Sequence, residues 1–412
     1  MKLTNRAIAD FFVLLPLILV YVGTILLKVY PPGGRFIKLF VFFYMAAYVL
    51  IKRKVDKNLF IATLLFLPFL IWGIFHSFNL RAGIEDGLRY LFPVVVLFYG
   101  YAIRDRFPLL LKFLIVYLLI NFIAQFFNYY YWMKGVRQWF YPETVNGDWY
   151  VNQVGGIMRA TGLLVNFDLL AFLGLVSFIL IYLYYNGKYK KWLLAIALFL
   201  MFASVSYKTL FTFIIVLFIL FYKRMTRILL AMIVGALIAT VFYPDKARNL
   251  VKGFYYRLDS YILMKTPTVR AETYLLMWKE LGHGNLLGRG VGMFGGPASI
   301  KYNSPYYKEV NFKRYDTYWM KMTTVDTFPP HVFIELGLIG GLMFFLVLVS
   351  PLFRRKIPVS VILIYLSLFI NMLFTFSLAA FEYLIMSLLL VYPLIEYHKR
   401  QRQNTVPQPA DN

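Results

Sequence analysis

Residues 324–341, TVDTFPPHVFIELGLIGG, mark the point where a polar segment of the chain becomes a long apolar run. Pro329 and Pro330 precede the run, and proline is tolerated in the first turn of a helix but not in its interior. The run is long enough to cross a bilayer, which takes about 20 predominantly apolar residues in a helix. The sequence therefore predicts a transmembrane helix whose first turn contains His331.

Apolar runs of this kind recur along the chain, which has 412 residues and is 61% hydrophobic. A soluble domain is roughly 45–50% apolar. The runs indicate an all-α polytopic membrane protein with about 12 transmembrane helices. The twelve predicted helices lie at about residues 11–28, 36–51, 59–77, 88–103, 108–131, 162–185, 191–206, 209–222, 226–243, 331–350, 357–377 and 380–397.

The basic residues between the runs predict an orientation. If the N-terminus is cytoplasmic, each inside segment is rich in Lys or Arg, as the positive-inside rule expects. These basic segments are residues 52–54, 104–106, 188–191, 223–224, 354–356 and 398–400. Residues 1–397 then form one integral-membrane domain and residues 398–412 a cytoplasmic polar tail. Residues 133–158 and 244–330 become extracytoplasmic loops, the larger one between the ninth and tenth helices.

Charge and cysteine content exclude several classes of function. The net charge of +24 arises largely from the short inside segments, so the orientation rule explains it and we expect no nucleic-acid partner. The chain has no cysteine, which excludes disulfides and thiolate metal sites. The loop 244–330 also has more Lys and Arg than Asp and Glu, although the rule does not apply to long loops. A basic outer surface suits an anionic partner such as a diphosphate, or lipid headgroups.

His331 is the first candidate for catalysis. A helix N-terminus disfavours a positive charge, so the imidazole should be neutral and able to accept a proton from a hydroxyl group. Glu335 lies four residues later, on the same helical face, where it could orient the ring. The alternative is that His331 is a polar residue at a helix mouth without chemistry. His283, in the glycine-flanked sequence ELGHGNLLGRG, is a second candidate for the base.

Three cations from different segments are predicted to share the outer face: Arg159, Lys208 and Arg270. A diphosphate is bound best by several converging cations. The alternative is that each cation contacts a lipid headgroup separately. Asp168 and Glu382 lie within predicted spans, and such costly polar groups are expected to face the bundle interior or a wet cavity.

Four motifs occur in an order that resembles the O-antigen ligase/polymerase superfamily of membrane glycosyltransferases. They are Arg159 with TGLLVNFD, the sequence SVSYKT around Lys208, RAETYLLMW with LLGRGVGMFG after Arg270, and PPHVFIELGLIGG around His331. The resemblance covers residues 155–350 at the level of motifs and the whole chain at the level of layout. Members of this family act on glycans linked to undecaprenyl diphosphate at the outer face of the membrane.

The resemblance implies a metal-independent glycosyltransferase without a cofactor. It implies that Arg270, Lys208 and Arg159 bind the substrate diphosphate and that His331, with Glu335, is the catalytic base. Two features depart from the family pattern. Lys208 stands where many members have arginine, which keeps the charge but loses the bidentate fork. The family has about nine residues from the histidine to the glutamate and this chain has four, a difference that turns the histidine by about 140° on a helix.

The resemblance also implies a location and partners. The protein would be a multi-pass protein of the bacterial cytoplasmic (inner) membrane that makes surface polysaccharide or lipopolysaccharide. Its partners would be a lipid-linked donor, a glycan acceptor, membrane lipids, a flippase and a chain-length regulator. The acceptor is a second lipid-linked repeat for a polymerase, which we favour, or lipid A core for a ligase. A lipid-linked glycan transporter or flippase is the alternative from another class, and it predicts buried charges along several spans and broken helices.

Overall fold

The computed structural model describes residues 5–135, 153–154, 157–164, 166–242, 244–245, 248, 251–252, 255, 259, 269–312, 327–354, 356–375 and 377–405. Over these residues the chain is almost entirely helical, which confirms the predicted fold class in that respect. Two short strands, β1 (Gln153–Val154) and β2 (Ile157–Met158), pair in an antiparallel hairpin.

A helix lies at each of the predicted apolar runs, and the last run holds two. The helices there are α1 (Asn5–Val29), α2 (Pro31–Lys52), α3 (Lys57–Phe75), α4 (Leu80–Ala102), α5 (Phe107–Met133), α6 (Phe167–Tyr184), α7 (Lys190–Ala203), α8 (Tyr207–Phe221), α9 (Met225–Phe242), α14 (Phe328–Val349), α15 (Val359–Phe374), α16 (Phe381–Met386) and α17 (Leu388–Thr405). Between α9 and α14 lie α11 (Val269–Gly282), α12 (Pro297–Lys301) and α13 (Tyr306–Glu309). The described residues also contain the 3₁₀ turns η2 (Tyr222–Arg224), η3 (Ser350–Leu352) and η4 (Ser377–Ala379).

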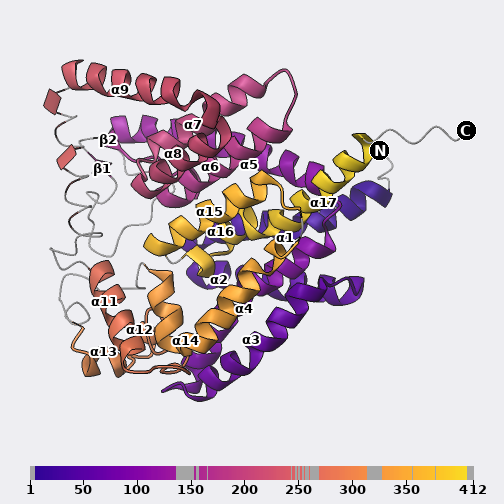
Figure 1. The fold of residues 1–412 in the computed structure, drawn as a ribbon, viewed down its shortest axis with the longest axis vertical. Helices are drawn as coiled ribbons and strands as arrows, with labels where there is room; N and C mark the ends of the chain where they lie inside the picture. Colours follow the sequence, from indigo (N-terminus) through magenta and orange to yellow (C-terminus); the bar gives the residue numbers. More distant parts are fainter. Residues whose placement is uncertain are drawn as a thin grey trace, which may run out of the picture.

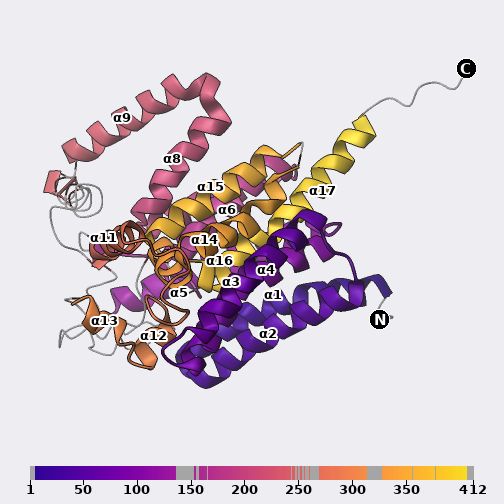
Figure 2. The same cartoon turned by 60° about the horizontal axis from the view of Figure 1, so that its bottom comes forward.

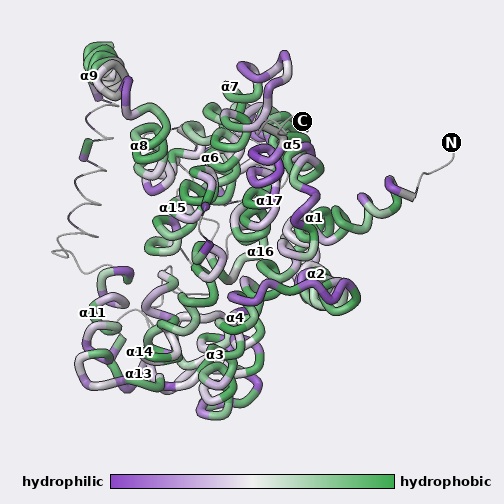
Figure 3. Tube along the Cα trace, turned by 45° about the vertical axis from the view of Figure 1, so that its right-hand side comes forward, coloured by the Kyte–Doolittle hydropathy of each residue, from purple (hydrophilic) through white to green (hydrophobic). Residues whose placement is uncertain are grey.

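Six helices in the described part of the chain are long and apolar enough to cross a membrane: α1, α2, α3, α5, α6 and α14. The α15 helix is apolar but shorter. Figure 3 shows apolar residues along most helices and hydrophilic residues at several helix ends and connections. The protein thus has the helices of a membrane protein, while the twelve-span topology stays a prediction.

The last predicted helix differs from the structure in two respects. The last predicted helix, 380–397, is interrupted at Ser387, which has φ −129° and ψ −84°, so α16 and α17 are separate. The helix also continues beyond its predicted end at residue 397 into the polar tail, because α17 ends at Thr405. An ion pair between Arg400 and Glu396, one turn apart, supports this extension. Residues 406–412 lie outside the described chain.

The helices form a bundle in which α6 is buried at every residue from Leu169 to Ile181 and packs against α5, α7, α8, α15 and α16. The α1 and α2 helices pair as a hairpin, α14 packs against α3, and α17 packs against α4. Both termini lie at one end of the bundle and α11, α12 and α13 at the other, as Figures 1 and 2 show from two directions. The α9 helix stands apart from the bundle.

Contacts at the end near the termini join segments predicted to share the cytoplasmic side. Arg106 forms an ion pair with Asp10 across 2.5 Å, and Arg354 forms one with Asp56. The ring of Tyr397 lies 4.8 Å from that of Phe107. The opposite end of the bundle carries the N-terminal end of α14, where His331 and Glu335 lie.

Candidate functional site

His331 and Glu335 lie on one face of α14, as their spacing predicts, and both are buried. Nδ1 of His331 donates to the carbonyl oxygen of Phe294 across 2.5 Å. The backbone N–H of Phe294 donates to Oε1 of Glu335 across 2.9 Å. The pair thus holds both backbone polar groups of one loop residue, and Pro329 and Pro330 occupy the first turn of α14 beside it.

The hydrogen bond to Phe294 fixes the tautomer of His331. A carbonyl oxygen can only accept, so Nδ1 carries the hydrogen and Nε2 of a neutral ring has the lone pair. Nε2 lies 3.6 Å from Oε2 of Glu335. A proton arriving at Nε2 would lie beside this carboxylate, which would stabilise the imidazolium. The arrangement can therefore accept a proton, provided that a donor reaches Nε2.

Tyr90 of α4 completes the environment of this pair. Its hydroxyl group donates to Oε2 of Glu335 across 3.0 Å. Its ring lies parallel to the imidazole of His331, with 2° between the planes and 5.2 Å between the centroids. No motif in the sequence singled out Tyr90, because 245 residues separate it from Glu335.

The α14 helix is broken just beyond Glu335. Gly337 has φ 70° and ψ −175°, which removes the regular helical hydrogen bonds at this point. The N–H of Leu338 donates instead to the carbonyl oxygen of Asn285 across 3.0 Å, and that of Ile339 to Leu286 across 3.1 Å. A loop far away in sequence thus replaces the partners that the helix lacks.

The same loop satisfies the carbonyl groups on the other side of the break. Ile334 accepts from the N–H of Arg289 across 2.9 Å, and Glu335 accepts from the N–H of Gly290 across 3.1 Å. In a continuous helix these two carbonyls would accept from residues 338 and 339. Non-helical backbone at membrane depth requires such replacement partners within the protein. The glycine-rich loop at residues 285–290 is therefore an integral part of the fold of α14.

Close approach explains the glycines of this loop. Gly288 has φ +89°, and a Cβ there would lie 2.0 Å from the carbonyl oxygen of Glu335. Gly295 has φ +80°, and its Cβ would lie 3.1 Å from that of His331. A side chain at either position would displace the backbone that holds the histidine–glutamate pair.

Arg289 ties the loop to α11. Its Nε and Nη2 donate to the two carboxylate oxygens of Glu280 across 2.8 and 3.1 Å. This bidentate hydrogen bonding raises the pKa of Arg289 above its usual value. The contact with Glu280 therefore places the guanidinium group of Arg289 beside α11.

Lys208 is paired with a carboxylate. Its Nζ donates to Oδ2 of Asp168 across 2.6 Å and also contacts the hydroxyl of Thr375. Oδ1 of Asp168 accepts from Ser206 across 2.5 Å. Lys208 and Asp168 are both mostly buried, at the junction of α6, α8 and the end of α15. Asp168 was expected to face the bundle interior or a wet cavity, and the ion pair with Lys208 compensates its charge where it is buried.

Arg159 is buried and faces backbone. Its Nε and Nη2 donate to the carbonyl oxygens of Ser204 and Val205 across 3.1 and 2.9 Å. Val205 has φ +46°, and the tight turn between α7 and α8 leaves these carbonyls for a side chain to satisfy. Arg159 thus fixes the turn that leads to Lys208.

Arg270 lies in the first turn of α11, which meets both α14 and α15. Thr273 shares a hydrogen bond of 2.9 Å with Thr327, the residue just before α14. The hydroxyl of Tyr274 donates to the carbonyl oxygen of Leu373 across 2.8 Å. Burial raises the pKa of Tyr274, and the nearby Arg270 charge opposes this shift. The α11 helix, which carries Arg270, and Lys208 therefore both contact the same end of α15, through Tyr274 at Leu373 and at Thr375.

The structure places the other candidates apart from this arrangement. His283 is exposed in the turn after α11, two residues before Asn285. Glu382 is buried in α16, where it pairs with Lys38 across 2.6 Å and contacts Thr24. Within the described residues, no group of three or more His, Asp or Glu side chains is arranged to hold a metal ion.

Comparisons with known proteins add no further constraint. No protein-family model matches the chain, and no curated protein matches it.

Proposed function

We propose that this protein is a membrane glycosyltransferase of the O-antigen ligase/polymerase type. It would transfer or polymerise glycan from an undecaprenyl-diphosphate carrier at the outer face of the bacterial inner membrane. The observation that most supports this proposal is the His331–Glu335 pair at the mouth of α14, held by Tyr90 and by the backbone of Phe294. The helix that carries Arg270 packs against this mouth and against the end of α15 beside Lys208.

In the proposed reaction Arg270 of α11 and Lys208 hold the donor diphosphate. Arg270 offsets the charge of this leaving group, and Lys208 donates a hydrogen bond to it from its ion pair with Asp168, while Arg159 positions the turn before Lys208. Nε2 of His331 removes the proton from the acceptor hydroxyl. The oxygen then attacks the anomeric carbon, a new glycosidic bond forms, and the bond to the diphosphate breaks.

Burial of the base sets one requirement for this reaction. His331 is only 1% exposed, so an acceptor hydroxyl reaches Nε2 only after neighbouring groups move. The segment that covers it on one side includes Phe294 and Gly295, whose backbone lies against the imidazole. The proposed mechanism therefore includes a displacement of this segment when the acceptor binds.

A transporter or flippase for a lipid-linked glycan is the second candidate, and specific observations favour it. The buried pair of Lys38 and Glu382 joins α2 to α16, and α14 is broken at Gly337. Buried charges and broken helices are typical of transporters. In this protein, however, backbone groups of the loop at residues 285–290 satisfy the hydrogen bonds at the break in α14. The buried charges of Glu382 and Asp168 are each neutralised by a lysine of the protein itself. We therefore favour the transferase.

One reconstitution experiment separates these candidates. The purified protein is placed in vesicles with a lipid-linked oligosaccharide, and the products are separated by size. A polymerase lengthens the lipid-linked glycan, whereas a ligase requires added lipid A core. A transporter moves the oligosaccharide across the bilayer without forming a glycosidic bond, and that result would overturn our proposal.

Arg270→Ala is expected to weaken donor binding roughly 10–100-fold, the effect of losing one or two charge-assisted hydrogen bonds. Arg270→Lys should restore binding only in part, because an ammonium group cannot form a bidentate fork. Lys279→Ala is the matched control, since Lys279 is exposed on the same helix. Donor binding is measured with a labelled lipid diphosphate. Equal binding by Arg270→Ala and wild type would remove Arg270 from the site.

The proposed orientation makes a separate prediction. A reporter that is active only in the cytoplasm should give signal when fused after residue 190 or 355. It should give none after residue 145 or 300, because these positions lie in the predicted extracytoplasmic loops. Signal after residue 300 would place the candidate site on the cytoplasmic side and contradict a reaction at the outer face.

A further inference from the structure

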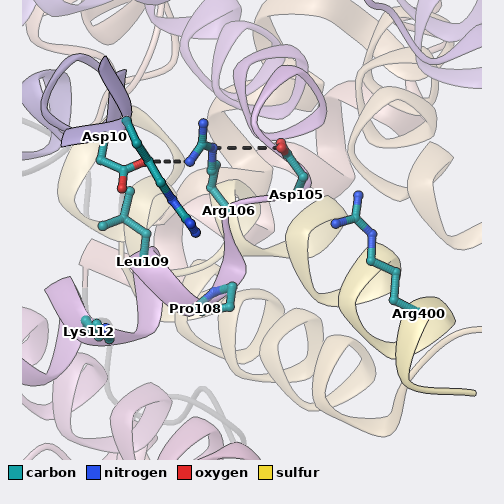
Figure 4. Close-up of a pocket in the computed structure, with 8 residues that line it drawn as sticks. Asp10, Asp105, Arg106, Pro108, Leu109, Lys112 and Arg400 are labelled. Carbon is teal, nitrogen blue, oxygen red and sulfur yellow. Dashed lines mark hydrogen bonds and ion pairs between the residues drawn. The ribbon is translucent and has the colours of Figure 1, made fainter. Parts of the chain in front are cut away.

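A basic cavity of about 630 Å³ lies at the end of the bundle near the termini, far from the candidate site along the chain. The charged residues that line it are Arg6, Asp10, Asp105, Arg106, Lys112 and Arg400. They come from α1, the connection between α4 and α5, α5 itself, and α17, as Figure 4 shows. Three parts of the chain that are distant in sequence, residues 6–10, residues 105–112 and Arg400, therefore contribute charge to one cavity.

The cavity carries an excess of positive charge. Arg106 is already paired, with Asp10 at 2.5 Å and with Asp105 at 3.8 Å. Arg6 and Lys112 form no ion pair with any residue that the structure describes. Arg400 uses only Nε for Glu396, at 3.1 Å. Figure 4 shows Arg106 between the two aspartates and Arg400 on the far side of Asp105.

An anionic oxygen group fits this distribution of donors. Several cations from different segments converge best on a phosphate, which has oxygens in several directions. The first turn of α5 also lines the cavity, at Pro108 and Leu109, and a helix N-terminus favours negative charge. The two aspartates pair with Arg106, so among the described residues they leave Arg6 and Lys112 available to the anion.

The surroundings of the cavity favour a lipid over a soluble anion. From Lys112, an exposed apolar stripe follows α5 through Val116 and Ile120, which are 54% and 44% exposed. On α1, Phe11 and Phe12 are exposed a little beyond Arg6. A cation at the end of an exposed apolar stripe matches a lipid, whose phosphate lies next to its acyl chains.

We propose that this cavity binds the phosphate headgroup of an anionic phospholipid, with acyl chains along the exposed stripe of α5. The bound lipid would hold α1, α5 and α17 together and so join the two ends of the chain. The basic segments at this end are those predicted to be cytoplasmic, and anionic lipids attract such segments. The inference does not depend on the proposed transferase activity.

The test uses the full-length protein in neutral detergent, with thermal unfolding and native mass spectrometry as readouts. Added phosphatidylglycerol should raise the unfolding temperature and give a bound-lipid adduct, whereas phosphatidylcholine with the same acyl chains should do neither. In the variant with Arg6→Gln and Lys112→Gln, the apparent affinity should fall roughly fivefold per cation. The unfolding temperature of this variant without lipid shows whether it folds.

A matched control separates this site from general surface charge. The variant with Lys188→Gln and Lys191→Gln removes two exposed cations from another basic connection and should retain wild-type affinity. Equal losses in both double variants would overturn the proposal, as would equal effects of the two lipids on wild type. Equal stabilisation by inorganic pyrophosphate would identify a soluble anion as the ligand and overturn the lipid assignment. If the cavity variant does not fold, adduct formation by wild type with each lipid still decides the question.

Discussion

Replacing His331 with alanine is expected to lower the rate of glycan transfer roughly 10²–10⁴-fold, the usual contribution of a positioned general base. Binding of the lipid-linked donor should change little, because the proposed diphosphate contacts come from Arg270 and Lys208. His331→Gln should fail as well, since its amide has hydrogen-bonding groups but no basic nitrogen. Single-turnover transfer and donor binding are measured on the same preparations in vesicles.

The contacts of His331 also allow a purely structural role, which this experiment can exclude. The imidazole holds the loop at Phe294, so a residue with only that role would affect stability and donor binding together with transfer. Unfolding temperature is therefore measured for each variant. Loss of transfer with retained donor binding and a modest change in unfolding temperature supports the base. Parallel losses in all three quantities would contradict it.

His283→Ala provides the comparison within the same chain. His283 is exposed after α11 and contacts neither Glu335 nor Tyr90 in the described structure, so its variant should transfer at a near-normal rate. An active His331→Ala with an inactive His283→Ala would move the base to the loop. If both variants stayed active, neither histidine would be the base.

The helices could be predicted because their signal is local. Each apolar run and each basic connection is contiguous in sequence, so the positions of the helices follow without knowledge of their partners. The same local signal located His331 and Glu335 on one face of α14.

The parts that could not be predicted depend on contacts between distant residues. The break at Gly337 is stable only because residues 285–290 supply hydrogen bonds, and no local pattern connects these two segments. Arg159 was expected at a diphosphate, yet it donates to the carbonyls of Ser204 and Val205. Those carbonyls become acceptors only once the turn between α7 and α8 has formed. Lys208 was also expected at the diphosphate, and the structure pairs it with Asp168.

Gly337→Ala is expected to be the most destabilising single substitution at the broken helix, by on the order of 2–5 kcal/mol. A Cβ at this position would lie 2.3 Å from the backbone nitrogen of Gly288, and the backbone has φ +70°. The substitution therefore combines a strained dihedral angle with a clash against backbone that cannot rotate away. The measurement is thermal or denaturant unfolding of the purified protein, together with its level in the membrane.

Two other glycines separate the causes of this effect. Gly284 has φ +80° but nothing within 4 Å of its Cβ position, so Gly284→Ala should cost only the dihedral strain, about 1–2 kcal/mol. Gly282 has open space and no positive φ, so Gly282→Ala should be neutral or stabilising by up to about 1 kcal/mol. The order of stability should be Gly282→Ala, then Gly284→Ala, then Gly337→Ala. If Gly337→Ala were as stable as Gly284→Ala, the loop would not lie against the break, and the backbone contacts that position Glu335 and His331 would have to be reassigned.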